Sequence, residues 1–299
     1  MATYKTVTVK PSQGDYSNLN AVNDFEATDL TATAGDLVIQ CYNFVDTTQA
    51  LFDAVEWVTD PTHRVVIQAV NDHGGKWNTG CYRMTGTTTT IINRTVDYMT
   101  ITGVQVNITT SGSNAGAFIA DSLLNAVGTT VIDKLIMFGL GSHTTGYGVA
   151  NNEPLHDVYI RNSLIYSTYR GLSSAGTGST IYADNCTIDD CSDYGVYISY
   201  GGHRLRNTRI TNCAAVTSSG TLHVDSNYNL TDGDVSGITN WGANSLDSTD
   251  TPTISYVDST NADRTARDYH IQPNDSGVGA GMDLSGDGWS DDIDGDARS

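Results

Sequence analysis

The sequence predicts an all-β solenoid, and three observations point to it: a repeat in the low twenties, strand-type alternation within each copy, and many residues that favour turns. The copies align without gaps over residues 158–165, 181–188 and 203–210. Asn162, Asn185 and Asn207 hold the same position in these copies, 23 and 22 residues apart. A fixed period of this length, combined with strands, is typical of proteins in which each repeat forms one coil of a solenoid.

Each copy has the alternation of a β-strand, in which successive side chains point to opposite faces. One column is apolar and faces inward: Ile160, Ala183 and Leu205. The next column faces outward and alternates in charge: Arg161, Asp184 and Arg206. Stacked strands lie about 4.8 Å apart, so the opposite charges become neighbours and favour this register. An asparagine at a bend can bond to backbone groups and to the asparagine above it, so Asn162, Asn185 and Asn207 are the predicted structural ladder.

This arrangement resembles the asparagine ladder of right-handed parallel β-helices, the fold of pectate-lyase-like enzymes and phage tailspikes. The resemblance covers most of the chain and implies a single-stranded right-handed parallel β-helix. The composition agrees, because 299 residues with 30 glycines and only 5 prolines suit a long chain of strands and turns. We expect one elongated body, with an N-terminal cap and first strands in residues 1–62, β-helix coils in 63–232 and an irregular C-terminal cap in 233–299.

The N-terminal segment predicts a strand followed by a short amphipathic helix. Residues 4–10 alternate like a strand. Ser17 is a suitable helix N-cap, and Leu19, Val22 and Phe25 follow at helical spacing. Such a pair resembles the cap that closes the first coil of many β-helices, where a core and an unpaired edge would otherwise be exposed.

Further strands are expected over residues 37–45, 64–70, 98–106 and 131–138. Residues 49–59 fit either a short helix or an irregular bulge, and the sequence leaves that choice open. Lys134 takes the place of the ladder asparagine in its coil. Gly148-Val149, Gly171-Leu172, Gly195-Val196 and Gly220-Thr221-Leu222 predict the start of a second strand in successive coils.

The C-terminal part changes character after the predicted last coil at residues 225–232. Residues 233–266 lose the period and are expected to form an irregular crossing segment. The final stretch combines an aromatic and histidine run at 268–273, a glycine-rich run at 277–281 and an acidic run at 291–295. It resembles the closing motif that often follows the repeats of parallel β-helices in secreted and phage proteins, which implies a cap rather than an active site.

The net charge of −19, from 15 basic and 34 acidic residues, argues against nucleic-acid binding because such a surface repels phosphate. No apolar run reaches membrane-spanning length, so we expect no membrane insertion. The first residues lack the apolar core of a signal peptide. We therefore expect synthesis in a host cytoplasm and, for work outside the cell, a route such as assembly into a virus particle that is released by lysis.

The C-terminal acidic run has the oxygen spacing of a twelve-residue calcium loop. The candidate metal ligands are Asp283, Ser285, Asp287, Asp291 and Asp294. The run departs from the EF-hand pattern at its end, where an aspartate replaces the bidentate glutamate, and no flanking helices are evident. Ca²⁺ is the one cofactor that the sequence suggests, and the alternative is that these aspartates form turns and bond to nearby backbone.

Four carboxylates are the catalytic candidates if the chain is an enzyme: Asp184, Asp189, Asp190 and Asp193. Two carboxylates at a suitable separation can hydrolyse a glycoside. A calcium-bound uronate beside a basic residue can instead undergo elimination. Gly201-Gly202-His203 does not match the Gly-His-Gly motif of polygalacturonase-type enzymes. Solvated turn carboxylates and a ladder of charges are the alternative, which we favour.

An outward column of aromatic residues is the predicted contact site. Tyr159 and Tyr182 occupy this column, and Arg204 continues it. Tyrosine rings can stack on sugars and their hydroxyls form hydrogen bonds, so the column suits a glycan or a partner protein. The alternative is ordinary cross-strand packing on a sheet surface.

Together these features predict a non-enzymatic structural and adhesive protein on the surface of a bacteriophage particle, such as a head-decoration, fibre or tailspike-type protein. The phage assignment depends on the resemblance and not on the chemistry of particular residues. Expected partners are other virion proteins of the capsid or tail, a host surface glycan and, by similarity to tailspikes, further copies of the chain in a homotrimer. The alternative function is a polysaccharide lyase or glycoside hydrolase that cleaves an acidic polysaccharide through the outward aspartates.

Overall fold

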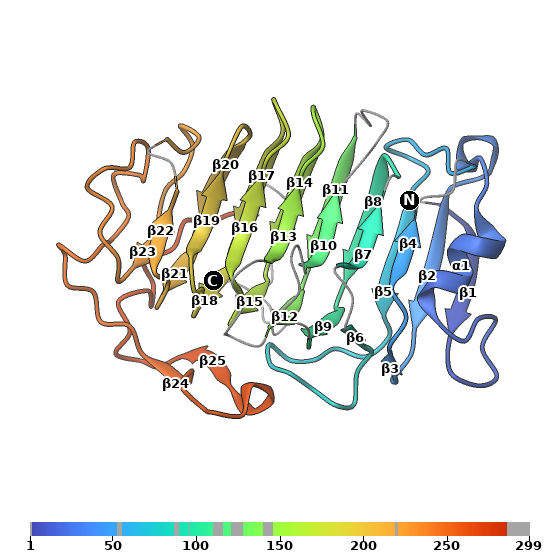
Figure 1. Cartoon of the computed structure of the whole chain (residues 1–299), viewed down its shortest axis with the longest axis horizontal. Coiled ribbons are helices and arrows are strands. Elements are labelled where there is room, and N and C mark those ends of the chain that lie inside the picture. The colour runs from blue at the N-terminus through green and yellow to red at the C-terminus, as the bar shows by residue number, and fades with distance from the viewer. Residues whose placement is uncertain are drawn as a thin grey trace.

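The computed structural model describes residues 2–52, 56–86, 90–94, 96–109, 116–120, 128–139, 146–218 and 221–285. Within them the chain is predominantly β, and most strands belong to three long parallel sheets. The strands of each sheet follow one another along the long axis of the molecule (Figure 1). The prediction of an all-β chain built from parallel strands is therefore confirmed.

From β2 to β22 the chain visits the three sheets in turn, and we call one such passage a round. The first sheet contains β1 (Thr3–Val9), β2 (Asp36–Cys41), β5 (Val65–Ala69), β8 (Tyr98–Thr102), β11 (Thr129–Asp133), β14 (Asp157–Arg161), β17 (Thr180–Asp184) and β20 (Gly202–Arg206). The second contains β3 (Val45–Asp46), β6 (Arg83–Gly86), β9 (Gln105–Ile108), β12 (Ile136–Phe138), β15 (Leu164–Tyr166), β18 (Thr187–Asp189), β21 (Arg209–Thr211) and β23 (Leu230–Thr231). The third contains β4 (Ala50–Phe52), β7 (Thr90–Arg94), β10 (Gly116–Ala120), β13 (Tyr147–Asn151), β16 (Arg170–Ser174), β19 (Tyr194–Ile198) and β22 (Ala215–Thr217).

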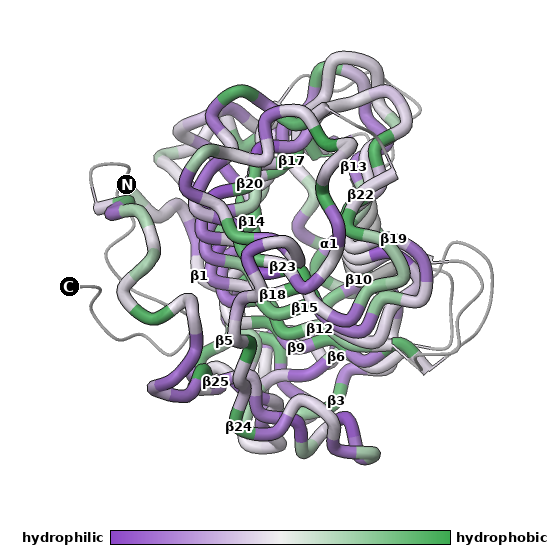
Figure 2. Tube along the Cα trace, turned by 90° about the vertical axis from the view of Figure 1, so that its left-hand side faces the viewer, coloured by the Kyte–Doolittle hydropathy of each residue, from purple (hydrophilic) through white to green (hydrophobic). Residues whose placement is uncertain are grey.

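The repeat in the sequence sets the register of the sheets, because residues one repeat apart pair in neighbouring strands. Two in-register columns are fully buried, Ile160–Ala183–Leu205 in the first sheet and Ile165–Ile188–Ile210 in the second. They face the interior between the sheets, and Figure 2, which looks along the stack, shows the strands arranged around it. Burial of such apolar columns is the main stabilising contribution, at roughly 25 cal/mol per Å².

The glycines near the start of the third-sheet strands are required by space. A Cβ on Gly171 would lie 2.4 Å from an isoleucine methyl group of the next round and 2.6 Å from a carbonyl oxygen. The same crowding holds at Gly148 and Gly195. Three of the four expected strands are present, as β13, β16 and β19. The fourth differs, because Gly220 lies outside the described residues and β22 begins at Ala215.

The N-terminal helix closes one end of the stack. It is α1 (Leu19–Glu26), and its Leu19 and Val22 are fully buried, as expected. Two details of the prediction are wrong. The N-cap is Asn18 rather than Ser17, since Oδ1 of Asn18 accepts a hydrogen bond from the backbone N–H of residue 21 at 2.9 Å. Phe25 is 76% exposed rather than part of the core.

The open question about residues 49–59 is settled in part by β4, which pairs with β7 in the third sheet. Residues 53–55 lie outside the described residues. The segment therefore supplies the third-sheet strand of its round, rather than a helix, over the part that is described.

The far end of the stack is closed by residues 233–246, which contain turns and isolated bridges but no regular strand. Leu246 donates its backbone N–H to Asn229 at 2.8 Å, and Leu230 and Leu246 form a parallel bridge. Val235 and Trp241 are buried in the core. Isolated bridges continue the stacking here without the regular spacing that marks the earlier rounds.

Residues 253–285 turn back along the outside of the second sheet, and we call them the strap. They contain β24 (Tyr256–Asp258), the short 3-10 helix η2 (Arg264–Ala266) and β25 (Asp268–Ile271), and the two strands pair antiparallel. Tyr256 and Tyr269 pack on Phe138 and Tyr166, which point outward from β12 and β15. Figure 1 shows β24 and β25 beside the sheets rather than at the end of the stack. This part of the expected cap therefore covers an apolar sheet face.

Candidate functional site

The three ladder asparagines occupy the bend between the first and second sheets. Their φ values are 47°, 56° and 50° for Asn162, Asn185 and Asn207, in the left-handed region that asparagine tolerates better than most residues. Nδ2 of Asn185 donates to Oδ1 of Asn162 at 3.3 Å, and Nδ2 of Asn207 donates to Oδ1 of Asn185 at 3.0 Å. Lys134 and Tyr228 continue the column, with φ values of 53° and 56°. The amides thus join neighbouring rounds.

A second left-handed column lies at the bend between the second and third sheets. Its members are Ser167, Asp190 and Asn212, with φ values of 54°, 55° and 51°. Oγ of Ser167 donates to Oδ2 of Asp190 at 2.7 Å. The sequence reasoning missed this column because its residue types differ. The available signal was a small polar residue five positions after each ladder asparagine.

Asp184 and Asp193 are ion-pair partners of arginines rather than free carboxylates. The side chain of Asp184 is 3% exposed and contacts Arg204 at 2.9 Å and Arg206 at 2.7 Å. Asp193 contacts Nε of Arg170 at 2.7 Å. Charge-assisted bonds of this kind are about twice as strong as neutral ones. The charge of each carboxylate is therefore compensated by a neighbouring arginine.

Asp189 and Asp190 are held beneath the strap. Asp189 is 1% exposed and accepts hydrogen bonds from Thr211 at 2.6 Å and from the hydroxyl of Tyr269 at 2.8 Å. Burial raises the pKa of Asp189, against the opposing effect of these bonds. Asp190 accepts from Arg267 at 2.9 Å. Nη1 of Arg267 also donates to the Tyr269 hydroxyl at 3.3 Å, so the two carboxylates belong to one hydrogen-bond network, in which the side chain of Asp190 is 41% exposed.

Tyr159 and Tyr182 stack on the outward face of the first sheet, and Arg204 lies next to Tyr182. The ring centroids are 4.4 Å apart with an interplanar angle of 6°, and the guanidinium carbon of Arg204 is 4.6 Å from the centre of the Tyr182 ring. We call these three residues the tyrosine strip. Because the stacked faces are occupied, the strip presents ring edges and hydroxyls outward. That geometry suits hydrogen bonding better than stacking of a sugar on a ring face.

A second tyrosine cluster, on the third sheet, was missed by the sequence reasoning. The guanidinium carbon of Arg170 lies 3.5 Å from the centre of the Tyr197 ring and 5.1 to 5.9 Å from the rings of Tyr147, Tyr169 and Tyr194. Cation–π contacts of this kind stabilise by about 0.5–2 kcal/mol. The signal was the recurrence of tyrosine at or just before the start of three successive third-sheet strands, at Tyr147, Tyr169 and Tyr194. The aromatic rings and Asp193 surround Arg170, so contacts within the protein account for the clustering of these tyrosines.

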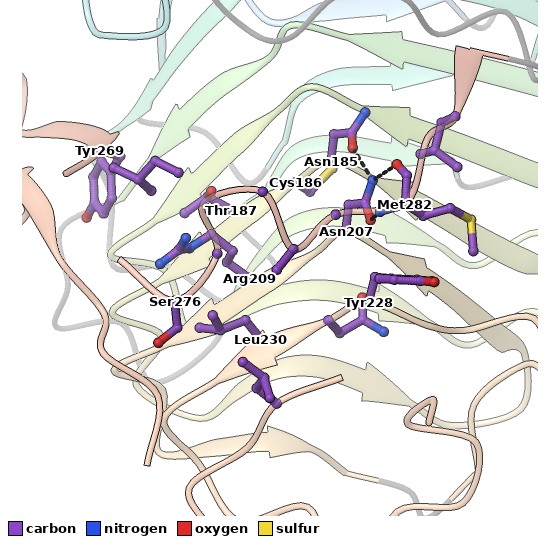
Figure 3. A pocket seen from close by; sticks show the side chains of 18 of the residues that line it. Asn185, Cys186, Thr187, Asn207, Arg209, Tyr228, Leu230, Tyr269, Ser276 and Met282 are labelled. Atoms are coloured by element: carbon purple, nitrogen blue, oxygen red, sulfur yellow. Dashed lines mark hydrogen bonds between the residues drawn. The ribbon is translucent and has the colours of Figure 1, made fainter. Parts of the chain in front are cut away.

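A groove of about 690 Å³ lies between the strap and the last rounds, and we call it the strap groove. Asn185, Asn207 and Tyr228 line it from the ladder bend, and residues 276–285 line it from the strap. Met282 joins the two sides: its N–H donates to Oδ1 of Asn207 at 2.7 Å, and its carbonyl accepts from Nδ2 of Asn207 at 2.8 Å. Figure 3 shows these residues around the groove. The sequence reasoning did not anticipate this groove, because the strap arrives from distant sequence.

Of the predicted calcium ligands, only Asp283 and Ser285 belong to the described residues. Asp287, Asp291 and Asp294 lie outside them. Oδ1 of Asp283 accepts the backbone N–H of Ser285 at 2.8 Å, which lowers the pKa of Asp283. Among the described residues, no group of three or more His, Cys, Asp or Glu side chains is placed to hold a metal ion.

Comparison with models of known protein families, with curated proteins and with solved structures gives no match to this chain. Across the described ranges, no helix is both long enough and apolar enough to span a bilayer. A functional assignment therefore comes from the geometry of the chain itself and from the resemblance that its repeats suggest.

Proposed function

We propose that the three sheets are the faces of one right-handed parallel β-helix, and that the protein is a non-enzymatic structural and adhesive component of the surface of a bacteriophage particle. The order in which the chain visits the sheets, the asparagine ladder and the helix over the first round support the first part. The particle is inferred from the resemblance of the repeats to phage tailspikes. A rigid stack of strands suits a protein that holds a contact surface at a fixed place.

The observation that carries the non-enzymatic assignment is the bonding of the four candidate carboxylates. Asp184 and Asp193 pair with arginines, and Asp189 and Asp190 bond to the strap. A typical glycosidase needs two carboxyl groups that face one substrate. Asp184 and Asp193 are held in ion pairs with arginines, and Asp189 and Asp190 in one network with the strap, so the geometry supports a structural role and does not favour polysaccharide cleavage.

The tyrosine strip is the proposed contact with a neighbouring virion protein. Tyr159, Tyr182 and Arg204 are half-buried on the outer face of the first sheet. Tyrosine and arginine are enriched at protein interfaces, where they combine apolar area with hydrogen-bond donors. The strap packs on the second sheet and leaves this strip accessible. In a homotrimer the neighbour would be another copy of the chain.

Immunolabelling of particles purified from the source, viewed by electron microscopy, tests this proposal. We expect an antibody to the protein to label the capsid or the tail. Particles that carry no label, or a source that yields none, would contradict the virion assignment. Purified protein is also expected to release no reducing ends or unsaturated uronates from acidic polysaccharides, and turnover there would show that it is an enzyme.

Calcium binding by the acidic C-terminal run is a separate proposal. An ion held only by the folded chain would stabilise it by about 2.7 kcal/mol when free Ca²⁺ is about one hundred times the dissociation constant. We expect the melting temperature to rise with calcium and to fall back with a chelator. The double substitution Asp291→Asn and Asp294→Asn is expected to abolish the rise. A melting curve that calcium and chelator leave unchanged rules out a stabilising site.

A further inference from the structure

The strap groove has the size of a small-molecule binding site. Its volume of about 690 Å³ falls within the range of about 300–1,000 Å³ that is usual for such sites. One side comes from the bend and second-sheet strands of successive rounds, and the other from residues 269–285 of the strap. The Met282–Asn207 hydrogen bonds fix the two sides relative to each other.

The cationic groups along the groove are compensated within the protein, whereas the Asp283 carboxylate has no cationic partner among the described residues. The two terminal nitrogens of Arg209 donate to the carboxylate of Asp275, at 2.7 and 2.6 Å. Nδ1 of His270 is hydrogen-bonded to Asp268. An anionic ligand would therefore meet no unpaired cation among the described lining residues. The net charge of −19 would also repel it from the surface as a whole.

The uncharged lining keeps hydrogen-bonding capacity for a ligand. Asn185 uses one N–H toward Asn162 and one lone pair toward Asn207, whereas a side-chain amide has two of each. The hydroxyls of Thr187 and Tyr228 also line the groove and bond to no other described residue. The groove thus offers both donors and acceptors, and the Asp283 carboxylate is the charged group of its described lining that lacks a counter-ion.

Tyr228 adds an aromatic ring to this lining. It holds the ladder position of the last round, and no other ring or cation of the described residues stacks on it, in contrast to Tyr159 and Tyr182. Figure 3 shows Tyr228 beside Asn207, on the side of the groove where Met282 lies. A planar apolar group therefore stands next to the amide groups.

We propose that the strap groove binds a neutral oligosaccharide. A sugar presents hydroxyls at its edges and C–H groups on its faces, which match the amides and hydroxyls of the groove and the ring of Tyr228. The uncompensated carboxylate of Asp283, together with the absence of an unpaired cation among the described lining residues, selects neutral sugars over uronates and sialic acids. The inference rests on the proposed function, because it names the chemical class and the site of the glycan that a particle-surface protein would bind.

Isothermal titration calorimetry of the full chain with short neutral oligosaccharides of glucose, galactose, mannose and N-acetylglucosamine tests this site. We expect saturable binding of at least one of them. Tyr228→Asn removes the ring and keeps a residue that tolerates a φ of 56°, so the fold is retained. We expect it to weaken binding by about tenfold or more. Tyr200→Asn, at a side chain that is 74% exposed and outside the groove, is the matched control and should bind as the wild type does.

Three results would overturn the proposal: no binding of any neutral sugar, equal affinity of the wild type and Tyr228→Asn, or tighter binding of oligogalacturonates than of neutral sugars. Melting curves of both variants show that a loss of affinity is not a loss of fold. Immunolabelling of particles does not depend on any of these results. A failed titration with labelled particles would therefore remove the sugar site and leave the virion assignment in place.

Discussion

Replacing Asp275 with alanine is expected to release the strap and to lower the free energy of unfolding by about 3–5 kcal/mol. The carboxylate is 0% exposed and accepts two hydrogen bonds from Arg209. It also accepts the backbone N–H groups of Ser255 and Gly277, each at 2.7 Å. Burial acts to raise the pKa of Asp275, but these bonds outweigh it and hold the pKa below its ordinary value. Without the carboxylate, Arg209 keeps a largely buried charge that has lost its counter-ion.

Melting curves and the rate of protease cleavage within the strap measure this effect, since the strap can open while the rounds stay folded. Asp263→Ala is the matched control in the same segment. Asp263 is exposed and caps η2, by accepting the N–H of Thr265 at 3.0 Å, so its loss should destabilise the protein much less than Asp275→Ala does. Adding Arg209→Met to Asp275→Ala should recover part of the stability, because it removes the orphaned charge. If Asp275→Ala and Asp263→Ala change the melting temperature and the cleavage rate equally, Asp275 does not anchor the strap.

The rounds over residues 157–211 were predictable because their contacts recur at a fixed separation in the sequence. Ile160 meets Ala183, and Ala183 meets Leu205, so a short alignment of the chain with itself reveals the register. The same residue type, asparagine, also recurs at the first bend of three successive rounds, which makes the ladder column visible. The second bend was not visible in this way, because serine, aspartate and asparagine serve there equally well.

The position of the strap could not be predicted, because its partners lie far away in sequence and follow no period. Tyr269 reaches Asp189 across 80 residues, and Arg209 reaches Asp275 across 66. Local pattern suggested a cap at the end of the stack, whereas apolar side chains on the second sheet attract the strap to that face. The same contacts explain why Asp189 looked like an exposed carboxylate in the sequence and is buried in the fold. The strap groove was missed for this reason too.

His203 has an unusual place for a titratable group, in the inward column of the first sheet next to Ile181. It is fully buried, and its Nε2 lies 3.3 Å from the carbonyl oxygen of Tyr197. Its Nδ1 has no hydrogen-bond partner in the described part of the chain. Burial lowers the pKa of His203 from its ordinary value of 6.5 to about 4, although the Tyr197 carbonyl acts in the opposite direction.

We therefore expect the protein to lose about 3 kcal/mol of stability as the pH falls from about 6.5 to about 4 through His203 alone, at about 1.4 kcal/mol per unit of pKa shift. In that interval the unfolded chain takes up a proton on His203 that the folded chain does not accept. The contribution is fully present above pH 6.5 and fully lost below about pH 4. Urea unfolding of the wild type and of His203→Leu between pH 4 and 7 measures it, and the variant should have a much smaller slope. Parallel losses in both proteins would assign the acid sensitivity to other groups.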